Sequence, residues 1–171
     1  MIIYFSTCSI YDNSLKESMY VQHKLFIEAY IKKNISRYII YRLPIVVGNN
    51  KNPHTLTNFI FNSITNNQII NVHTNACRYL IDIEDVVELV EKTLFCENQI
   101  INLNFDNKLS ILELIEIFEN ILKKKAIKKL IIKGSCYDID NAQLRDLIKL
   151  TNYQADYNYK IIEKYYKMKE I

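Results

Sequence analysis

Glycine is scarce in this chain, and its scarcity excludes one common way of binding a nucleotide. The 171 residues include two glycines, Gly48 and Gly134, and two prolines, Pro44 and Pro53. A glycine-rich turn between a strand and a helix allows the backbone to approach a pyrophosphate closely, and dinucleotide sites of this type need several glycines close together. Two isolated glycines cannot form such a turn. The sequence therefore predicts that this chain has no complete phosphate-binding turn.

Paired cysteine motifs and long apolar runs are also missing. The four cysteines, at positions 8, 77, 96 and 136, form no C-x-x-C pair, so we expect free thiols, as in a reducing cytoplasm. His73 and Cys77 are close in sequence, but two ligands do not make a zinc site, and we expect no metal. No apolar run reaches the ~18 residues that a membrane span needs. The opening segment 1–5 lacks the basic residues of a targeting sequence.

Charge of one sign is not concentrated anywhere in the chain. The formal net charge is +3, and the lysines are spread out apart from short runs at 123–125 and 128–129. We interpret these runs as a solvated helix end, and we expect no nucleic-acid partner. Nearly half of the residues are apolar, which is ordinary for a globular protein, and the length fits one domain.

Apolar periodicity alternates between strand-like and helix-like segments. Short apolar runs bounded by turn residues predict buried strands, and apolar residues at three- and four-residue spacing predict helices. Strands are expected at 1–6, 37–43, 68–73, 100–104 and 126–133, and helices at 18–33, 53–65, 83–95, 110–123 and 141–149. Strands that alternate with helices indicate an α/β fold with a largely parallel sheet. The tyrosine-rich tail from Thr151 gives no clear prediction.

Several residues should define the ends and faces of these elements. The first strand is apolar enough to be buried on both faces. Asp82 is expected to cap the helix at 83–95, and Ser110 with Glu113 should form a capping box at the next helix. Pro44 should end the strand at 37–43. The buried stripe of the helix at 18–33 is expected to consist of Tyr20, Leu25, Phe26, Ala29 and Tyr30.

Tyr20 and Lys24 form the first candidate site. Residues four apart lie one turn from each other on one helix face, and an ammonium beside a phenol favours the phenolate. Tyr20 could therefore move a proton on or off an alcohol oxygen. Ser6 and Thr7 follow the first strand, and ligands of open α/β sheets bind outside the carboxyl ends of the strands. The alternative for this pair is an exposed helix face with a solvated lysine.

The order of these segments resembles that of a known family. A strand ending in Ser-Thr, a Tyr-x-x-x-Lys-x-x-x-Glu helix, a second strand and the segment RLPIVVG at 42–48 follow one another. RYLIDIEDV at 78–86, NLN at 102–104, LSILEL at 109–114 and the region 138–150 continue the series. This series resembles the extended short-chain dehydrogenase/reductases, and within them the NAD-dependent epimerase/dehydratase family that acts on nucleotide sugars.

The resemblance implies roles for three residues in catalysis. Tyr20 matches the catalytic base, and Lys24 matches the lysine that holds the nicotinamide ribose and supports the tyrosine. Thr7, four residues before Tyr11, matches the hydroxyl that hydrogen-bonds the substrate sugar. The loop between Thr7 and Tyr20 is shorter than is usual in the family.

The resemblance also implies binding roles for three further residues. A residue near Pro44 lies along the nicotinamide in the family. Ile45 stands where the family has an asparagine that contacts the substrate. Arg78 matches an arginine that grips the nucleotide diphosphate, which suits a guanidinium fork. Glu28 matches a frequent glutamate that we interpret as structural.

Structural alternatives remain open for the charged residues. Arg42 follows a buried strand and could pair with a carboxylate, and Arg78 could pair with the acids at 82–85. Those acids read as helix-start charges rather than catalytic carboxylates. We expect His23 on the surface and the tyrosines of the tail in packing.

The resemblance spans nearly the whole chain but only the C-terminal part of the family's usual length. It implies a partial Rossmann-like parallel sheet with flanking helices, plus a small substrate-binding region. We expect one incomplete domain, in which residues 1–50 carry the catalytic Tyr and Lys and residues 51–171 form mainly the substrate-binding region. The N-terminal glycine-rich nucleotide-binding half is expected to be absent.

Two functions follow as expectations. The first is the catalytic half of an NAD- or NADP-dependent epimerase, dehydratase or reductase with a nucleotide-sugar substrate. The alternative is a non-catalytic remnant, or a subunit of a split enzyme that acts only with a separate nucleotide-binding partner. The first strand would then expose an unpaired edge. A homodimer through the Tyr-x-x-x-Lys helix is a further expectation, against which a monomer in sedimentation would count.

Overall fold

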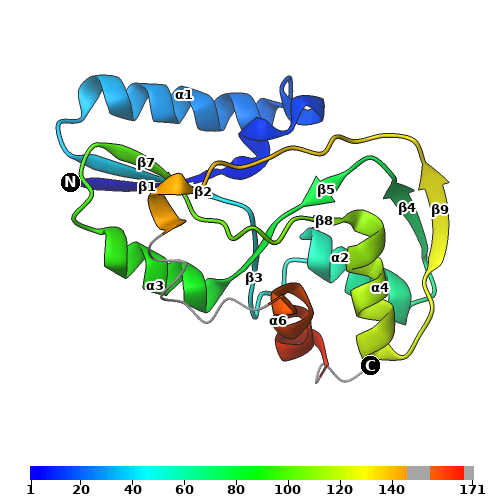
Figure 1. Ribbon diagram of the computed structural model, residues 1–171. Coiled ribbons are helices and arrows are strands. Elements are labelled where there is room, and N and C mark those ends of the chain that lie inside the picture. The colour runs from blue at the N-terminus through cyan, green and yellow to red at the C-terminus, as the bar shows by residue number, and fades with distance from the viewer. Residues whose placement is uncertain (146–154, 168–171) are drawn as a thin grey trace.

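A three-stranded parallel sheet forms one part of the molecule, with a helix on each face (Figure 1). The computed structural model describes residues 1–145 and 155–167. The strand order is β1-β2-β7, and α1 and α3 cover opposite faces. The bounds are β1 (Ile2–Thr7), β2 (Tyr38–Leu43), β7 (Gln99–Asn102), α1 (Met19–Asn34) and α3 (Ile83–Thr93). The predicted α/β fold with parallel strands is confirmed.

In the second part of the described chain, to the right in Figure 1, helices α2 (Leu56–Thr65), α4 (Ile111–Leu122) and α6 (Tyr157–Tyr166) pack around short strands. Parallel pairs join β3 to β6 and β4 to β9, and β5 pairs antiparallel with β8. Buried apolar side chains of α2, α4, α6 and β4 form one core, and a second core lies between the three-stranded sheet and α3. The bounds are β3 (Ile45–Val47), α2 (Leu56–Thr65), β4 (Ile69–His73), β5 (Cys77–Arg78), β6 (Leu80–Asp82), β8 (Leu109–Ser110), α4 (Ile111–Leu122), β9 (Ile127–Ile131) and α6 (Tyr157–Tyr166).

The predicted elements are found with shifted ends. Asp82 caps α3, and Ser110 with Glu113 forms the expected capping box of α4. The short strands β3, β5, β6 and β8 escaped prediction because two or three residues show no periodicity. Of the helix expected at 141–149, the structure shows a 3-10 turn at Ala142–Leu144, and residues 146–149 lie outside the described residues. No helix in the described ranges is long and apolar enough to cross a membrane.

Strand β1 is not buried on both faces, contrary to the prediction. It lies at the edge of its sheet and pairs only with β2 among the described strands. Ile2, Ile3 and Phe5 are 41%, 39% and 44% exposed. The apolar composition therefore does not reflect burial within this chain, and β1 presents the unpaired edge and the apolar surface that the alternative function requires.

The predicted buried stripe of α1 is also wrong. Tyr20, Phe26 and Tyr30 are 55%, 65% and 57% exposed, and the helix instead buries Val21, Glu28 and Ile31 against the sheet. Apolar spacing failed as a guide because the buried face carries a carboxylate. Buried polar groups are tolerated where hydrogen bonds satisfy them, and Glu28 has such partners.

Two cysteines are not free thiols, which corrects the expectation from sequence. Cys77 and Cys136 form a disulfide, and Cys8 and Cys96 are free. The cysteines are 59 positions apart in sequence, so the fold, and not a local motif, brings them together. Burial raises the pKa of the Cys8 thiol to about 12, which makes this free cysteine a poor nucleophile.

Glu119 joins α4 to β9 and gives a testable pH dependence. Burial would raise the pKa of its carboxyl, but hydrogen bonds from Lys128, the Ala126 N–H and Lys125 outweigh burial and lower the pKa from 4.5 to about 2. A depressed folded-state pKa contributes stability that is present above pH 4.5 and lost as the pH falls toward 2. Up to about 3 kcal/mol of the free energy of unfolding should depend on this carboxylate.

Glu119→Gln should therefore flatten the acid side of the stability profile, measured by urea unfolding at a series of pH values. The difference between the two proteins should shrink as the pH falls. Glu116→Gln, at an exposed position of the same helix, is the matched control and should retain the parent profile. An unchanged profile in Glu119→Gln would contradict the assignment.

Candidate active site at the carboxyl ends of the strands

Thr7 ends β1, at the edge of the sheet where parallel strands deliver their carboxyl ends. Its side chain is nearly buried, and its Oγ1 accepts a hydrogen bond of 3.1 Å from the N–H of Ser9, which caps a 3-10 turn at Cys8–Tyr11. A hydroxyl that accepts one bond can still donate its own hydrogen. The placement of Ser6 and Thr7 at the strand end is as predicted. The hydrogen bond from Ser9 thus fixes the Thr7 side chain, and the Thr7 hydroxyl can still donate a hydrogen bond.

Tyr20 and Lys24 lie one turn apart at the amino-terminal half of α1, beside that strand end. Lys24 Nζ donates a 2.9 Å hydrogen bond to the carbonyl oxygen of Phe5 and lies 5.9 Å from the Tyr20 ring centroid. It also lies 4.9 Å from the ring centroid of Tyr4. The Phe5 carbonyl therefore holds the ammonium between β1 and the ring of Tyr20. The ring of Tyr20 remains open to solvent.

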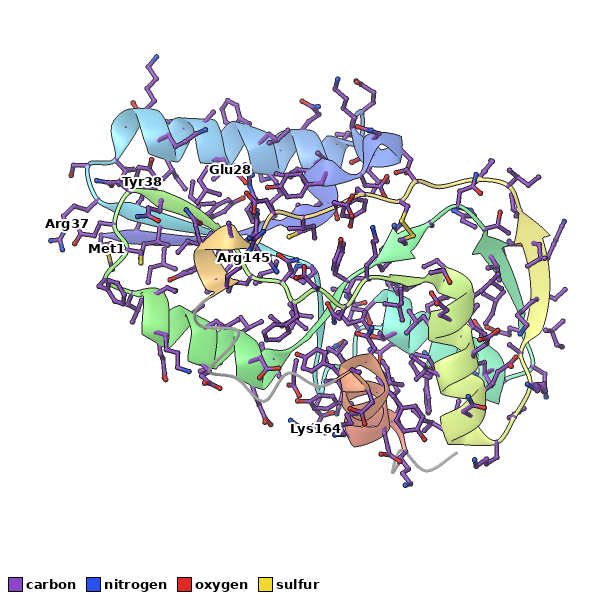
Figure 2. All side chains as sticks on the ribbon, viewed as in Figure 1. Met1, Glu28, Arg37, Tyr38, Arg145 and Lys164 are labelled. Carbon is purple, nitrogen blue, oxygen red and sulfur yellow. A yellow bond between two sulfur atoms is a disulfide. The ribbon has the colours of Figure 1, made fainter. Side chains whose placement is uncertain are left out.

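Glu28, one turn after Lys24, fixes α1 to the sheet from below the helix (Figure 2). Ser6 Oγ donates to Glu28 Oε1 at 2.6 Å, and Arg42 donates through Nε and Nη2 at 3.0 and 2.6 Å. Burial would raise the pKa of Glu28, but the bonds from Arg42 and Ser6 outweigh it, so the pKa lies below its ordinary value. Arg42 therefore pairs with a carboxylate, and the structural interpretation of Glu28 agrees with this geometry.

The contacts of Arg42 extend to Tyr11 and Asn102, a connection that sequence reasoning missed. Arg42 Nη1 donates to Tyr11 Oη at 2.8 Å, and Tyr11 Oη donates to Asn102 Oδ1 at 3.0 Å. Asn102 Nδ2 then donates to the Asp140 carbonyl at 2.7 Å. These groups line a cavity of about 250 Å³. Tyr11 and Asn102 are 91 positions apart in sequence, so no local pattern could have predicted this grouping.

Pro44 and Ile45 occupy the step between β2 and β3. Pro44 ends β2 as expected, and the Ile45 N–H donates to the Tyr79 carbonyl at 3.1 Å. Ile45 pairs with Leu80 in the sheet and packs against the larger apolar core. An isoleucine here offers no side-chain hydrogen bond to a ligand. Any contribution of Ile45 to binding would come from shape and apolar contact.

Arg78 pairs with Asp12 and not with the acids at 82–85. The Arg78 guanidinium lies 3.3 Å from Asp12 Oδ2 and donates through Nη1 to the Cys77 carbonyl at 2.6 Å. Burial would raise the pKa of Asp12, but bonds from Ser135 and Ser14 and the charge of Arg78 outweigh it and lower the pKa. Asp82 instead caps α3 and accepts hydrogen bonds from Lys164 and Tyr165. The acids at 82–85 thus start a helix, as expected.

A nicotinamide dinucleotide has a ribose at its nicotinamide end and a pyrophosphate in its middle. Tyr20 and Lys24, one turn apart on α1, offer a hydroxyl and an ammonium that could bind a ribose, whereas neither glycine joins a strand to the start of a helix. Gly48 follows β3 against Ile83, and Gly134 lies against Ala76. The described part of the chain thus offers no backbone turn that fits a pyrophosphate. Within the described ranges, no group of three His, Cys, Asp or Glu side chains could hold a metal ion.

Comparisons with known proteins support the fold. No family model and no curated protein sequence matches this chain. Among solved structures, the chain is similar to dTDP-glucose 4,6-dehydratase of Bacillus anthracis in complex with NAD, with a TM-score of 0.77 and 15% identity. The match covers 98% of this chain and 62% of that one.

Two further structures give the same result. UDP-glucuronic acid 4-epimerase of Bacillus cereus, in complex with UDP-glucuronic acid and NAD, gives a TM-score of 0.73 at 19% identity and covers 96% of this chain and 60% of that one. UDP-glucose 4-epimerase of Thermus thermophilus, in complex with NAD, gives a TM-score of 0.72 at 12% identity. That match covers 98% of this chain and 64% of the epimerase chain. This chain therefore has the fold of the NAD-dependent nucleotide-sugar epimerases and dehydratases, over about three fifths of their length.

Proposed function

We propose that this chain is the catalytic and substrate-binding half of an NAD- or NADP-dependent enzyme that acts on a nucleotide sugar. The observation that carries the proposal is that Thr7 ends β1, while Tyr20 and Lys24 lie one turn apart on α1 with Lys24 bonded to the Phe5 carbonyl of β1, in a fold that nucleotide-sugar epimerases and dehydratases share. The reaction class comprises epimerisation, dehydration and reduction. Residues 1–50 would supply the catalytic groups, and residues 51–171 mainly the substrate-binding region.

The residues present can carry out the proton-transfer part of such a reaction. Tyr20 would accept the proton of a sugar hydroxyl as a general base. Thr7 would donate a hydrogen bond that orients this hydroxyl, and Lys24, bonded to the Phe5 carbonyl oxygen, would support Tyr20 and bind the nicotinamide ribose. A bound nicotinamide cofactor would supply the site for hydride transfer. Pro44 would pack beside the nicotinamide.

Arg78 is the residue that we propose to bind the diphosphate of the substrate. A guanidinium presents several N–H donors in a fork that matches phosphate oxygens. In this structure its fork contacts Asp12 and the Cys77 carbonyl, so ligand binding would replace or extend these contacts.

A nucleotide-binding half from outside the described residues would complete the site. The observation that favours it is the free edge of β1, which pairs only with β2 among the described strands. Beside β1 lies an apolar hollow of about 300 Å³, lined mainly by side chains of β1, β2 and α3: Phe5, Leu43, Ile83, Val86, Val87 and Val90. A parallel strand with its helix could pair with β1 and fill this hollow.

Alternatively, the chain is a subunit of a split enzyme or a non-catalytic remnant. The free edge of β1 also favours this alternative.

The cytoplasm is the compartment that fits NAD-linked chemistry on nucleotide sugars. The exposed apolar side chains of α1, which include Met19, Phe26 and Tyr30, support the proposal of a homodimer through this helix.

Binding of UDP to the lone chain, measured by calorimetry in buffer that contains a dithiol, tests the substrate-binding role. Arg78→Met should weaken UDP binding about 10- to 100-fold, because a charge-assisted hydrogen bond contributes about 1.5–3 kcal/mol. The affinity of Arg78→Lys for UDP should lie between those of the parent chain and Arg78→Met. NAD⁺ should not bind the lone chain, since the pyrophosphate-binding turn is missing.

Arg37→Met is the matched control, because Arg37 is an exposed arginine in an ion pair with Glu97. It should bind UDP like the parent chain. Equal affinities in Arg78→Met and the parent would remove Arg78 from the substrate site. Tight NAD⁺ binding by the lone chain would contradict the need for an outside half.

A further inference from the structure

The segment between β9 and the 3-10 turn at Ala142–Leu144 runs across the molecule beside β5 (Figure 1). We name residues 132–139 of it the connecting segment. Its middle is joined covalently to β5 by the Cys77–Cys136 disulfide, seen as a yellow bond in Figure 2. Arg78 is the next residue of β5. The disulfide therefore lies directly beside the arginine that faces Asp12.

The disulfide closes a ring of contacts around Arg78. Ser135, which precedes Cys136, donates through Oγ to Asp12 Oδ1. Asp12 Oδ2 faces the Arg78 guanidinium at 3.3 Å, and Arg78 Nη1 donates to the Cys77 carbonyl at 2.6 Å. The connecting segment thus helps to hold Asp12, and Asp12 helps to hold Arg78 against its own strand.

Few other contacts hold the middle of the connecting segment. The Asn75 N–H donates to the Lys133 carbonyl at 3.1 Å, and the Cys77 N–H donates to the Ser135 carbonyl at 3.4 Å. Tyr79 Oη donates to the Tyr137 carbonyl at 3.3 Å, which anchors the segment beyond the disulfide. Without the disulfide, two backbone hydrogen bonds would still join residues 132–136 to the neighbouring region. They are the bonds from the N–H groups of Asn75 and Cys77.

The approach of the segment to its neighbour is close. Gly134 has a φ of +89°, and a Cβ added there would lie 2.7 Å from Ala76 Cβ. A side chain at position 134 would push the segment away from residues 76 and 77. The position of Cys136 relative to Cys77 thus depends on glycine at 134.

We propose that the Cys77–Cys136 disulfide is a redox-controlled closure of the connecting segment over Arg78, and that a dithiol reductant opens it. Cys136 is exposed and Cys77 is half-buried, so the Cys136 sulfur is the accessible one. Reduction releases residues 132–136 and makes the Arg78 guanidinium accessible to an anion.

The chemical step is thiol–disulfide exchange. A thiolate of the dithiol attacks the Cys136 sulfur, the bond to Cys77 breaks, and Cys77 leaves as a thiolate that takes up a proton. The second thiol of the reductant then attacks the mixed disulfide, which frees Cys136 as a thiol. The dithiol is oxidised to a disulfide by two electrons, and the protein disulfide is reduced to two thiols.

The regulatory meaning of this closure rests on the proposed function, which places the protein in the cytoplasm. Structural disulfides are rare in a reducing cytoplasm, where those that occur are usually transient and redox-sensing. An accessible disulfide in an NAD-linked cytoplasmic protein would be opened and closed by the cellular thiol pool.

Hydrogen–deuterium exchange of the whole chain tests the proposal without any substrate. In dithiothreitol, peptides that cover residues 132–136 should exchange at least about tenfold faster than in the oxidised chain, while β4 and β9 should not change. Phenylglyoxal should modify Arg78 several-fold faster after reduction. Equal exchange and equal Arg78 modification in both states would overturn the proposal, as would thiols at 77 and 136 that resist oxidation by glutathione disulfide.

Four variants separate the closure from general destabilisation. Cys77→Ser with Cys136→Ser should behave like the reduced chain and no longer respond to dithiothreitol, whereas Cys96→Ser should respond like the parent. Gly134→Ala should shift the equilibrium with glutathione toward the two thiols, because it moves Cys136 away from Cys77. Gly48→Ala is its matched control, since a Cβ there would also be crowded, 2.9 Å from Ile83 Cγ2, but it would meet Ile83 of α3 and not Ala76, the neighbour of Cys77. An equal shift in both glycine variants would overturn the proposal.

Discussion

Arg42→Met should lower the free energy of unfolding by about 3–5 kcal/mol, because it leaves the Glu28 carboxylate buried without its cation. Glu28 is 1% exposed, and Arg42 supplies two of the three side-chain hydrogen bonds that it accepts. Methionine retains much of the apolar part of the arginine side chain. The loss of unfolding free energy therefore measures the contribution of the charge and the hydrogen bonds. Urea unfolding at neutral pH measures the effect as a lower midpoint at an unchanged slope.

The pH dependence and the double variant identify the cause. The penalty in Arg42→Met should shrink in acid, because Glu28 can then take up a proton and become neutral. Glu28→Gln combined with Arg42→Met should recover part of the loss, since no unpaired charge remains. Arg37→Met breaks an exposed ion pair and should hardly move the midpoint. A similar loss in both arginine variants would show that burial of the pair is not what matters.

Tyr20→Phe should reduce turnover about 10²- to 10⁴-fold in the enzyme completed by its nucleotide-binding half, the range expected on loss of a general acid or base. The substitution removes one oxygen from an exposed ring, so neither the fold nor the midpoint of unfolding should change. The assay would follow NADH formation and sugar products with a panel of UDP- and dTDP-hexoses. KM should change much less than kcat, since the hydroxyl acts in the transition state.

Tyr30→Phe is the matched control for this experiment. Tyr30 is an exposed tyrosine of the same helix, but it lies far along α1 from the end of β1. Its turnover should equal that of the parent enzyme. Unchanged turnover in Tyr20→Phe would rule out the proposed base. Equal losses in both variants would point to the surface of α1 as an interface and not to proton transfer.

The sequence alone determined the features that depend on near neighbours in the chain. Alternating apolar periods gave the order of strands and helices, and the caps at Asp82 and Ser110 require only residues two or three positions away. The placement of Ser6 and Thr7 at a strand end, and the spacing of Tyr20 and Lys24 on one helix face, follow in the same way. Such features are local, because backbone hydrogen bonds and side-chain periods within one element decide them.

The tertiary structure alone decided the features that join distant segments. α1 turns Glu28 inward and Phe26 outward because Ser6 and Arg42, from two different strands, satisfy the buried carboxylate. Likewise Arg78 meets Asp12, and Cys77 meets Cys136, because the connecting segment returns past β5 after β9. The spacing of apolar residues in the sequence indicates only whether a segment forms a helix or a strand. Which polar groups are buried depends on whether the fold brings them a partner, since an unpaired buried charge is too costly to keep.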